Sequence, residues 1–519
     1  MGDFLSLFLR ISCLLGVSWI VRLVYWVWWK PMKLERQLRA QGFTGPPYRL
    51  LFGNLRENSW MVEEALSKPM NLSHQILPRV VPHLYNTVKE YGKMSMNWFG
   101  PMPRLNIMDP ELIREILSRN DHFEKPPQTP LTKFLATGVA VYRREKWVMH
   151  RRLLSPAFHL QKLKCMLPAF SMSCSELVKR WETLIGSQES YELDVWPELQ
   201  TFAGDVISRT AFGSSYKEGK RIFELQAEQG LLLTKARRIV YIPGFRFLPT
   251  KDNLRRKALD RDVTALLRAM IEKREIAMKM GESGNNDLLS LLLESNNNNC
   301  NESQEHGKNF KNIRMTTEDI IEECKLFYFA GHETSLVLLT WTMILLSMHP
   351  SWQERAREEV LQVFGKNAPD FNGLNHLKIV PMILYEVLRL YIGGVLIRQT
   401  YKEMKLGKLT IPPGVQIALP SNLIHRDPEF WGDDAEEFKP ERFVGGVSNA
   451  AKHQMAFFPF GGGPRICIGQ NFAMIESKMA LAMILQHFSF ELSPLYVHAP
   501  KTVITIQPQY GAQIILRKV

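Results

Sequence analysis

A single cysteine in a glycine-rich bend is the residue best placed to do chemistry. The segment FGGGPRICIG (460–469) carries Cys467 just ahead of an apolar run, from Phe472 onward, that predicts a helix. A helix N-terminus stabilises a thiolate through its dipole and its free backbone N–H groups. Arg465 adds a cation for an anionic partner, and the glycines allow the backbone to approach a flat ligand closely. The pattern favours a thiolate that binds something.

A second segment places polar groups where an apolar helix should have none. The run LFYFAGHETSLVLLTW (326–341) is apolar except for its centre, His332 to Ser335. Burying an unpartnered polar group costs roughly 2–7 kcal/mol, so these groups need partners or a function. Glu333 and Thr334 together provide an acid and a hydroxyl, which suit proton transfer. Ala330 lies four residues before Thr334 and therefore on the same helix face.

The glycine-rich segment resembles the haem-binding loop of the cytochrome P-450 family. The shared pattern is Phe460-x-x-Gly463-x-Arg465-x-Cys467-x-Gly469. The resemblance implies that Cys467 is the axial thiolate of haem b, whose electron donation favours O–O cleavage. It also implies that Phe460 shields the sulfur and that Arg465 binds a haem propionate. Read alone, the segment would also suit a buried structural cysteine beside a glycine turn.

The polar centre of the long helix is similar to the oxygen-binding segment of the same family. On that resemblance Ala330 and Gly331 make room for oxygen above the iron. Thr334 would hydrogen-bond the oxygen and Glu333 would relay protons from solvent. A threonine inside a helix can instead bond a carbonyl of the preceding turn. We expect His332 to be a satisfied helix-surface residue and Ser335 to serve packing.

Three further motifs are weak alone and gain weight together. Glu386 and Arg389 lie three residues apart, a spacing common on solvated helix surfaces. With Arg442, in the segment PERF, they resemble the buried Glu-Arg-Arg triad of the family. The segment WVMHR resembles the helix whose Trp147 and Arg151 contact the haem propionates; alone it reads as an amphipathic fragment.

One departure from the family lies after Tyr391. Relatives usually carry two prolines there, whereas this chain has Ile392, Gly393 and Gly394. Glycine raises backbone freedom, so we expect a changed substrate site rather than a borrowed substrate preference. The segment is also one residue short ahead of Arg398, a candidate propionate ligand whose register is therefore open.

The N-terminus predicts a membrane anchor. From Phe4 to Trp29 the chain is apolar and aromatic, with two arginines near its ends. At 1.5 Å per residue this stretch can cross a hydrocarbon core of about 30 Å. The basic residues that follow place the body on the cytosolic side. A cleaved signal peptide is the alternative, but no small-residue cleavage site precedes the tryptophans. We expect an anchor over 1–30, a basic, proline-containing linker over 31–48 and one large domain over 49–519.

The composition limits the class of protein. The 519 residues carry a formal net charge of +13, which favours anionic partners such as membranes or acidic proteins. The basic residues are scattered without aromatic interleaving, which argues against nucleic acid. Six cysteines without zinc or disulfide spacing favour single functional thiols.

The patterning predicts a mainly α protein with small β-sheets. Thr316 is an N-cap candidate for a helix that runs to about Met348, and the stretches VITIQP and AQIILRK alternate like a hairpin around Tyr510-Gly511. The Asn-rich stretch 294–312 is expected to be an exposed loop.

Over nearly the whole chain behind the anchor, the sequence resembles plant cytochromes P-450 of the seventy-two clan, nearest the seventy-two A group. The runs that carry this are RLLFGN, DVISRTAFGSSYKEG, YIPGFRFLPTK and HAPKTVITIQPQYGA. The resemblance implies the cytochrome P-450 fold and a monomeric, single-pass monooxygenase of the endoplasmic reticulum. It would oxidise a C–H bond of a small apolar isoprenoid, with electrons from NADPH through NADPH–cytochrome P-450 reductase. A triterpenoid or steroidal aglycone is the first expectation, an iridoid or gibberellin the second.

Two other classes stay open on the sequence. A haem-thiolate isomerase or dehydratase would need no reductase, but such enzymes can dispense with the acid–threonine pair that Glu333 and Thr334 provide. An inactive haem carrier or membrane scaffold would not need Cys467 together with Thr334.

Overall fold

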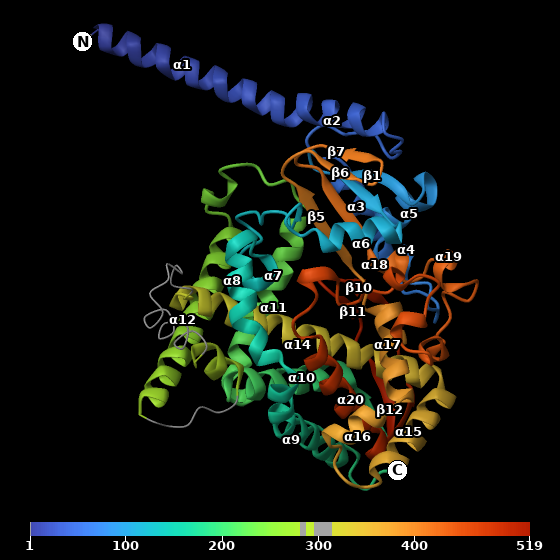
Figure 1. Cartoon of the computed structure of the whole chain (residues 1–519). Coiled ribbons are helices and arrows are strands. Elements are labelled where there is room, and N and C mark those ends of the chain that lie inside the picture. Colours follow the sequence, from blue (N-terminus) through green and yellow to red (C-terminus); the bar gives the residue numbers. More distant parts are fainter. Residues whose placement is uncertain (1, 281–286, 295–313) are drawn as a thin grey trace, which may run out of the picture.

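The computed structural model describes residues 2–280, 287–294 and 314–519. A long N-terminal helix projects from a body in which helices surround a central one, with the largest sheet close to the base of the projecting helix (Figure 1). This architecture confirms the predicted class, mainly α with small β-sheets. The helices are α1 Gly2–Val24, α2 Lys30–Arg39, α3 Leu55–Leu66, α4 Leu77–Val80, α5 Pro82–Tyr91, α6 Pro110–Ser118, α7 Gly138–Val141, α8 Arg144–Leu154, α9 Leu160–Ile185, α10 Val195–Phe212, α11 Tyr216–Arg237, α12 Lys251–Lys279, α14 Thr317–Met348, α15 Pro350–Phe364, α16 Phe371–His376, α17 Ile379–Tyr391, α18 Ser421–Ile424, α19 Pro428–Trp431 and α20 Gln470–His487.

In Figure 1 the largest sheet lies near α2, β10 and β11 lie near the middle of the body, and β12 lies near the C-terminus. The largest has the order β1-β2-β8-β5-β3, with β2 and β8 parallel and the other pairs antiparallel. A second sheet has the order β4-β12-β9, and β6-β7 and β10-β11 are two-stranded. The strands are β1 Met94–Phe99, β2 Met102–Ile107, β3 Phe123–Glu124, β4 Tyr191–Asp194, β5 Val395–Thr400, β6 Met404–Leu406, β7 Leu409–Ile411, β8 Gln416–Pro420, β9 Phe488–Leu492, β10 Pro500–Thr502, β11 Ile506–Pro508 and β12 Gln513–Lys518.

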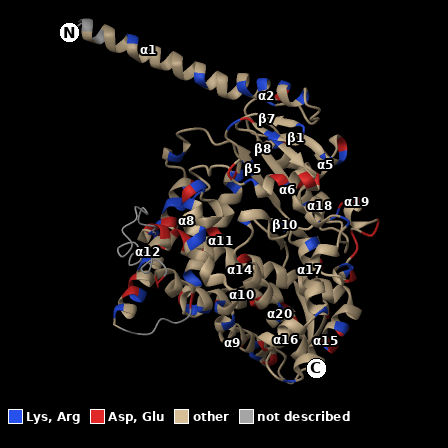
Figure 2. Ribbon diagram, viewed as in Figure 1, with Lys and Arg blue, Asp and Glu red and all other residues tan. Residues whose placement is uncertain are grey.

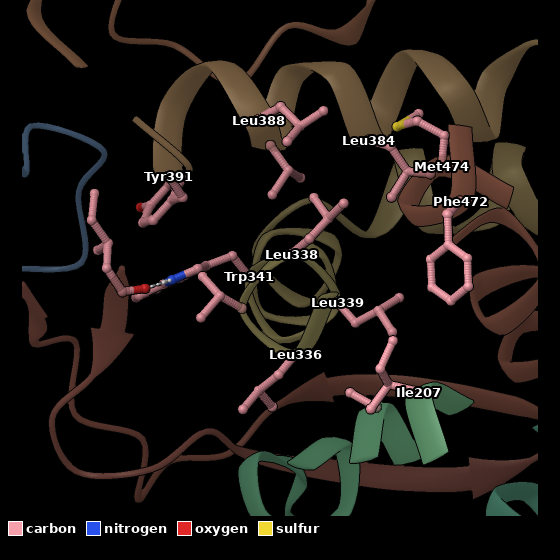
Figure 3. Packing of buried hydrophobic residues seen from close by; sticks show 14 of the residues in the cluster. Ile207, Leu336, Leu338, Leu339, Trp341, Leu384, Leu388, Tyr391, Phe472 and Met474 are labelled. Carbon is pink, nitrogen blue, oxygen red and sulfur yellow. Dashed lines mark hydrogen bonds between the residues drawn. The ribbon is translucent and has the colours of Figure 1, made fainter. Parts of the chain in front are cut away.

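The central element is α14, whose predicted bounds are confirmed. Thr316 and Asp319 form a reciprocal capping box at its start, which satisfies backbone N–H groups that a helix leaves free. The helix then runs without interruption for 32 residues to Met348. Its apolar side chains meet those of α10, α17 and α20, and the Trp341 indole donates to the Ile506 carbonyl at 2.7 Å (Figure 3). This burial explains why the second half of α14, from Leu336 onward, is largely apolar on every side.

The predicted hairpin around Tyr510-Gly511 is wrong. β11 pairs with β10, which precedes it, whereas β12 pairs with β4 and β9 from distant parts of the chain. Alternating patterns identify strands but do not identify their partners. The sequence therefore placed these strands and missed their pairing.

The expected linker over 31–48 differs from the structure. A short π-helical turn, Tyr25–Trp29, joins α1 to α2 without a break, so one helix continues from the anchor into the body. Leu34 and Leu38 of α2 are buried against the body. The span Ser6–Arg39 is long and apolar enough to cross a membrane, and none of its apolar part is buried in the body. α14 has similar length and composition but is mostly buried, as a core helix is.

Basic and acidic residues are scattered along the ribbon of the body and are intermixed in the view of Figure 2. The described cysteines, Cys13, Cys165, Cys174, Cys324 and Cys467, are all free. The loop expected over 294–312 lies almost entirely outside the described residues.

Candidate active site

The Cys467 loop is closed by a short backbone hydrogen bond. After a 3₁₀ turn over Gly463–Arg465, the Cys467 N–H donates to the Phe460 carbonyl at 2.9 Å. The cysteine keeps accessible surface, and α20 begins three residues later. Burial in the surrounding protein raises the pKa of the thiol, while a backbone hydrogen bond from Gly469 opposes that rise. The loop thus presents one sulfur atom with a donor already directed at it.

Gly463 has a packing role that the sequence did not indicate. Its φ is +64°, and a Cβ there would lie 2.1 Å from the Leu117 carbonyl at the end of α6. Close approach of α6 therefore requires glycine at this position. By contrast, a Cβ on Gly469 would contact only the Phe158 ring, at 3.9 Å.

Three cations, Arg465, Arg398 and Lys125, lie around this loop. Arg465 Nε and Nη1 are buried and have no hydrogen-bond partner in the described chain. The same is true of Arg398 Nε. Burial, and then the Arg398 charge, lowers the pKa of Arg465 to about 10. Lys125, which the sequence reading missed, belongs to the same cluster: burial and the charges of Arg398 and Arg465 lower its pKa to about 7. An anion between these groups would satisfy the free donors.

Helix α8 brings the two residues expected from the motif WVMHR to the same place. The Arg465 guanidinium lies over the Trp147 ring, 4.4 Å from its centroid. Arg151 donates from Nη1 to the Ile466 carbonyl at 3.0 Å. Trp147 and Arg151 therefore flank the cysteine loop.

Arg398 lies on β5, opposite Ile417 of β8. The sequence left the register of Arg398 open, and the structure places it near Arg465. The two glycines ahead of Arg398 contact the start of α18. A Cβ on Gly393 would lie 2.6 Å from the Asn422 Cα. The Gly394 N–H donates to the Ser421 hydroxyl at 3.0 Å, and that hydroxyl lies 2.9 Å from the Gly394 carbonyl, to which it can donate. Gly393 is therefore closely packed, whereas a Cβ on Gly394 would meet nothing within 4 Å, and the expected change in the substrate site stays a prediction.

The donor set fits haem b. A thiol is a soft ligand suited to iron, and the free donors of Arg398 and Arg465 suit the two carboxylates that the macrocycle carries. The bound group would supply oxygen activation. Lys125, Trp147 and Arg151 would complete the cradle around its carboxylates.

The polar centre of α14 separates into side chains that face different neighbours. Thr334 is exposed, between half-buried Glu333 and buried Ser335, and its hydroxyl donates to the Ala330 carbonyl at 2.7 Å. The helix is not loosened here, since α14 continues through these residues. Ala330 and Thr334 do share a face, as the spacing predicts.

Gly331 lies against α10. A Cβ on it would be 2.5 Å from the Ile207 Cδ1, so a larger residue there would require the Ile207 side chain to shift. His332 is buried rather than on the surface as expected. Its Nε2 bonds the Gln200 carbonyl at 3.1 Å, and burial lowers its pKa to about 4.

Glu333 turns toward the β10–β11 hairpin. Its Oε1 accepts hydrogen bonds from Thr505 Oγ1 and Gln507 Nε2, both at 2.5 Å. Burial raises the pKa of the carboxyl, and the two donors oppose the rise. Burial thus favours the protonated form of this carboxyl more than solvent exposure would.

Ser335 does more than pack. Its hydroxyl donates to Glu476 Oε2 at 2.5 Å, and both side chains are buried. Burial raises the pKa of Glu476, on α20, to about 8. Sequence reasoning missed Glu476; an acid within the apolar helix that follows the cysteine was the available signal.

The Glu-Arg-Arg triad has the expected contacts. Glu386 and Arg389 form a fully buried bidentate pair with both distances 2.7 Å, and Arg442 Nε lies 3.7 Å from Glu386 Oε1. Arg389 also donates to the carbonyls of His425 and Ala435. The triad ties α17 to the loops ahead of the cysteine segment.

The family model for cytochrome P450 matches residues 71–513. This chain is a cytochrome P450. It is 62% identical over 507 residues, 97% of each chain, to "Cytochrome P450 CYP72A616" of Paris polyphylla. It is 55% identical over 502 residues, 96% of each chain, to "Cytochrome P450 72A397" of Kalopanax septemlobus. It is also 51% identical to "Secologanin synthase 1" of Catharanthus roseus, over 97% of this chain and 96% of the relative.

The comparisons confirm the predicted family and its 72A group. This cytochrome P450 is therefore a haem-dependent monooxygenase that takes electrons from NADPH through a reductase. The N-terminal apolar helix fits attachment to a membrane.

Proposed function

We propose that this P450 inserts one oxygen atom into a C–H bond of an isoprenoid, with a triterpenoid or steroidal aglycone as the first candidate. Similarity to 72A cytochromes along nearly the whole chain carries this proposal. The same chemistry on an iridoid or a gibberellin is the second candidate. The similarity to a protein named secologanin synthase favours the iridoid alternative.

The site residues have separate roles in this proposal. Cys467 ligates the iron, Phe460 shields the sulfur, and Gly469 donates to it. Arg398, Arg465, Trp147 and Arg151 hold the carboxylates of the cofactor.

Thr334 and Glu333 manage protons on the opposite side of the site, with Ala330 and Gly331 forming the oxygen groove. The Thr334 hydroxyl is accessible and can release the Ala330 carbonyl to bond an oxygen. Glu333, whose Oε1 accepts hydrogen bonds from Thr505 and Gln507, relays protons from solvent inward.

The cellular setting belongs to the same proposal. We place the body on the cytosolic face of the endoplasmic reticulum, anchored by a single pass through residues 1–30 and acting as a monomer over 49–519. The net charge of +13 suits docking to an acidic reductase surface.

The test is product formation in microsomes that contain this chain and the reductase. With NADPH and O₂, a panel of triterpenoid, steroidal, iridoid and gibberellin substrates should yield one product heavier by one oxygen atom. Cys467→Ser should abolish the long-wavelength band of the reduced CO complex and the product. Cys165→Ser, which changes a free, exposed cysteine on α9, should leave both unchanged.

Other outcomes decide between the classes. Product from a hydroperoxide without reductase would make the chain an isomerase or dehydratase. A normal CO band with no substrate-dependent NADPH use across the panel would favour a haem carrier. A band that survives Cys467→Ser would overturn the ligand assignment.

A further inference from the structure

Helix α8 buries a histidine among apolar side chains. His150 is 0% exposed, and Trp147 and Leu154 lie with it on the buried face of the helix. A polar side chain in such a place needs partners, because burying it without them is costly. His150 is next in sequence to Arg151 and one turn from Trp147, the two residues of α8 that flank the Cys467 loop. Whatever fixes His150 therefore also limits where those two side chains lie.

The partner of His150 is a buried acid on α14. His150 Nδ1 lies 2.6 Å from Glu323 Oε1, so the ring N–H donates to the carboxylate. Both side chains are completely buried, and a charge-assisted bond is strong in such a low-dielectric interior. Glu323 lies seven residues before Ala330 and therefore on the same face of α14. The pair thus joins the helix beside the cysteine loop to the helix that carries Ala330 and Thr334.

The second oxygen of Glu323 faces a third element. Glu323 Oε2 is buried and has no hydrogen-bond partner among the described residues. A Cβ on Gly138, at the start of α7, would lie 2.6 Å from this oxygen. Gly138 has a φ of +55°, a left-handed conformation that glycine adopts without strain. The carboxylate is therefore packed between α7 and α8.

A second acid of α14 lies near the other ring nitrogen of His150. Asp319 Oδ1 is 3.8 Å from His150 Nε2, which has no hydrogen bond in the part of the chain that the structure describes. Lys146, one turn earlier on α8, forms an ion pair with the same oxygen at 2.6 Å. The Tyr142 ring meets the imidazole edge-on, with the ring centroids 4.6 Å apart. Two acids one turn apart on α14 thus face the two nitrogens of one imidazole.

The start of α8 is held by a different acid. Glu124 of β3 is buried and accepts hydrogen bonds from Arg144 Nε at 2.7 Å and from Arg143 Nη1 at 3.3 Å. These contacts fix the first turn against the largest sheet. The bond from His150 to Glu323 fixes the next turns against α14, in the part of α8 that lies beside the cysteine loop.

We propose that His150 is a positioning residue for the haem-binding site. Its buried bond to Glu323 fixes α8 against α14. Trp147 and Arg151 are thereby held where they meet the carboxylates of the cofactor. The inference rests on the roles proposed for Trp147 and Arg151, and it adds a residue that acts through them.

The test measures how fast haem leaves the full-length holoprotein in detergent when excess apomyoglobin captures it. His150→Leu should accelerate release on the order of tenfold, because α8 loses its bond to α14 and Glu323 is left buried without a donor. His150→Asn, whose amide N–H stands at the same place along the side chain as Nδ1, should restore most of the loss. His498→Leu is the matched control, since it removes a buried, hydrogen-bonded histidine that lies just before β10. It should keep the release rate of the parent.

A double variant separates positioning from general loosening of the fold. Arg151→Gln should itself accelerate release, and adding His150→Leu to it should change the rate by a smaller factor than His150→Leu changes the parent. Equal factors in the two backgrounds would overturn the inference, because His150 would then act independently of Arg151. Glu323→Gln keeps an acceptor for His150 and removes its charge. It should give a smaller acceleration than His150→Leu, and it provides the measurement if His150→Leu does not fold.

The remaining outcomes separate this inference from the proposed function. Faster release from Arg151→Gln with parental release from His150→Leu overturns the inference alone. Parental release from both Arg151→Gln and Trp147→Leu overturns the proposed carboxylate roles, and the inference with them. The expected pattern of release in a protein that forms no NADPH-dependent product supports the positioning role and overturns the proposed function. A full CO band before mixing shows that each variant starts with its haem site intact.

Discussion

The Glu476 carboxyl lies in the apolar core between α14 and α20, bonded to Ser335. Burial raises its pKa to about 8, above the unfolded value of 4.5. The folded protein therefore retains a proton that the unfolded chain loses as pH rises from about 4.5 to 8. The free energy of unfolding should fall in this window, by up to about 1.4 kcal/mol per pH unit.

Glu476→Gln should remove this dependence, because the amide keeps the hydrogen bond and cannot ionise. Measured by circular dichroism, the melting temperature of the variant relative to the parent protein should rise between about pH 5 and pH 8. Glu441→Gln, at an exposed acid, is the control and should follow the parent. Equal pH profiles for Glu476→Gln and the parent would show that Glu476 is ionised in the core.

Thr334 carries the other prediction at the residue scale. Thr334→Ala removes the accessible hydroxyl and its bond to the Ala330 carbonyl. Product formation should fall on the order of 100-fold while NADPH consumption falls much less, with hydrogen peroxide released. Thr334→Ser, which restores a hydroxyl, should recover coupling. Unchanged coupling in Thr334→Ala would remove this residue from the proton path.

At the scale of elements, α10 and α14 pack closely where Gly331 of α14 has no side chain. A methyl group on Gly331 would lie 2.5 and 2.9 Å from Ile207 Cδ1 and Cγ1. Gly331→Ala should therefore destabilise the protein by about 1–3 kcal/mol, because a packed helix pair cannot take the added volume without moving.

The double variant Gly331→Ala/Ile207→Ala tests the cause. Ile207→Ala alone leaves a cavity, and the new methyl group would partly fill it. The two changes should therefore be less destabilising together than their sum, by roughly 0.5–3 kcal/mol in denaturant unfolding. Additive effects would show that Ile207 is not what excludes a side chain from Gly331.

At the scale of the whole molecule, a continuous helix joins the anchor to the body. α1 continues through a π-helical turn into α2, and α2 buries Leu34 and Leu38 in the body. Removal of residues 1–24 should lower the fraction that sediments with membranes and leave the melting temperature nearly unchanged. Removal of residues 1–39 should destabilise the body, since each buried leucine contributes about 1.5–3 kcal/mol.

The melting temperatures of the two truncated chains show whether α1 or α2 stabilises the body. If both lower the melting temperature equally, α1 itself stabilises the body and the boundary between anchor and domain lies elsewhere. If neither lowers it, the contacts of α2 with the body add no stability and residues 31–48 behave as the linker that the sequence predicted.

The sequence by itself determined the chemistry and the elements that carry it. Residues close in the chain keep their spacing in any fold that contains the element. The Cys467 loop, the pair Glu386–Arg389 and the bounds of α14 could therefore be predicted from local pattern.

Only the tertiary structure decided which distant residues meet. Gln507 reaches Glu333, Glu476 reaches Ser335, and Lys125 joins Arg398 and Arg465 across hundreds of residues. It also decided that β12 pairs with β4 and β9, and that Gly331 and Gly393 are closely packed. The physical reason is that such contacts depend on how whole elements pack, and helical or strand periodicity in the sequence defines a face without naming its partner.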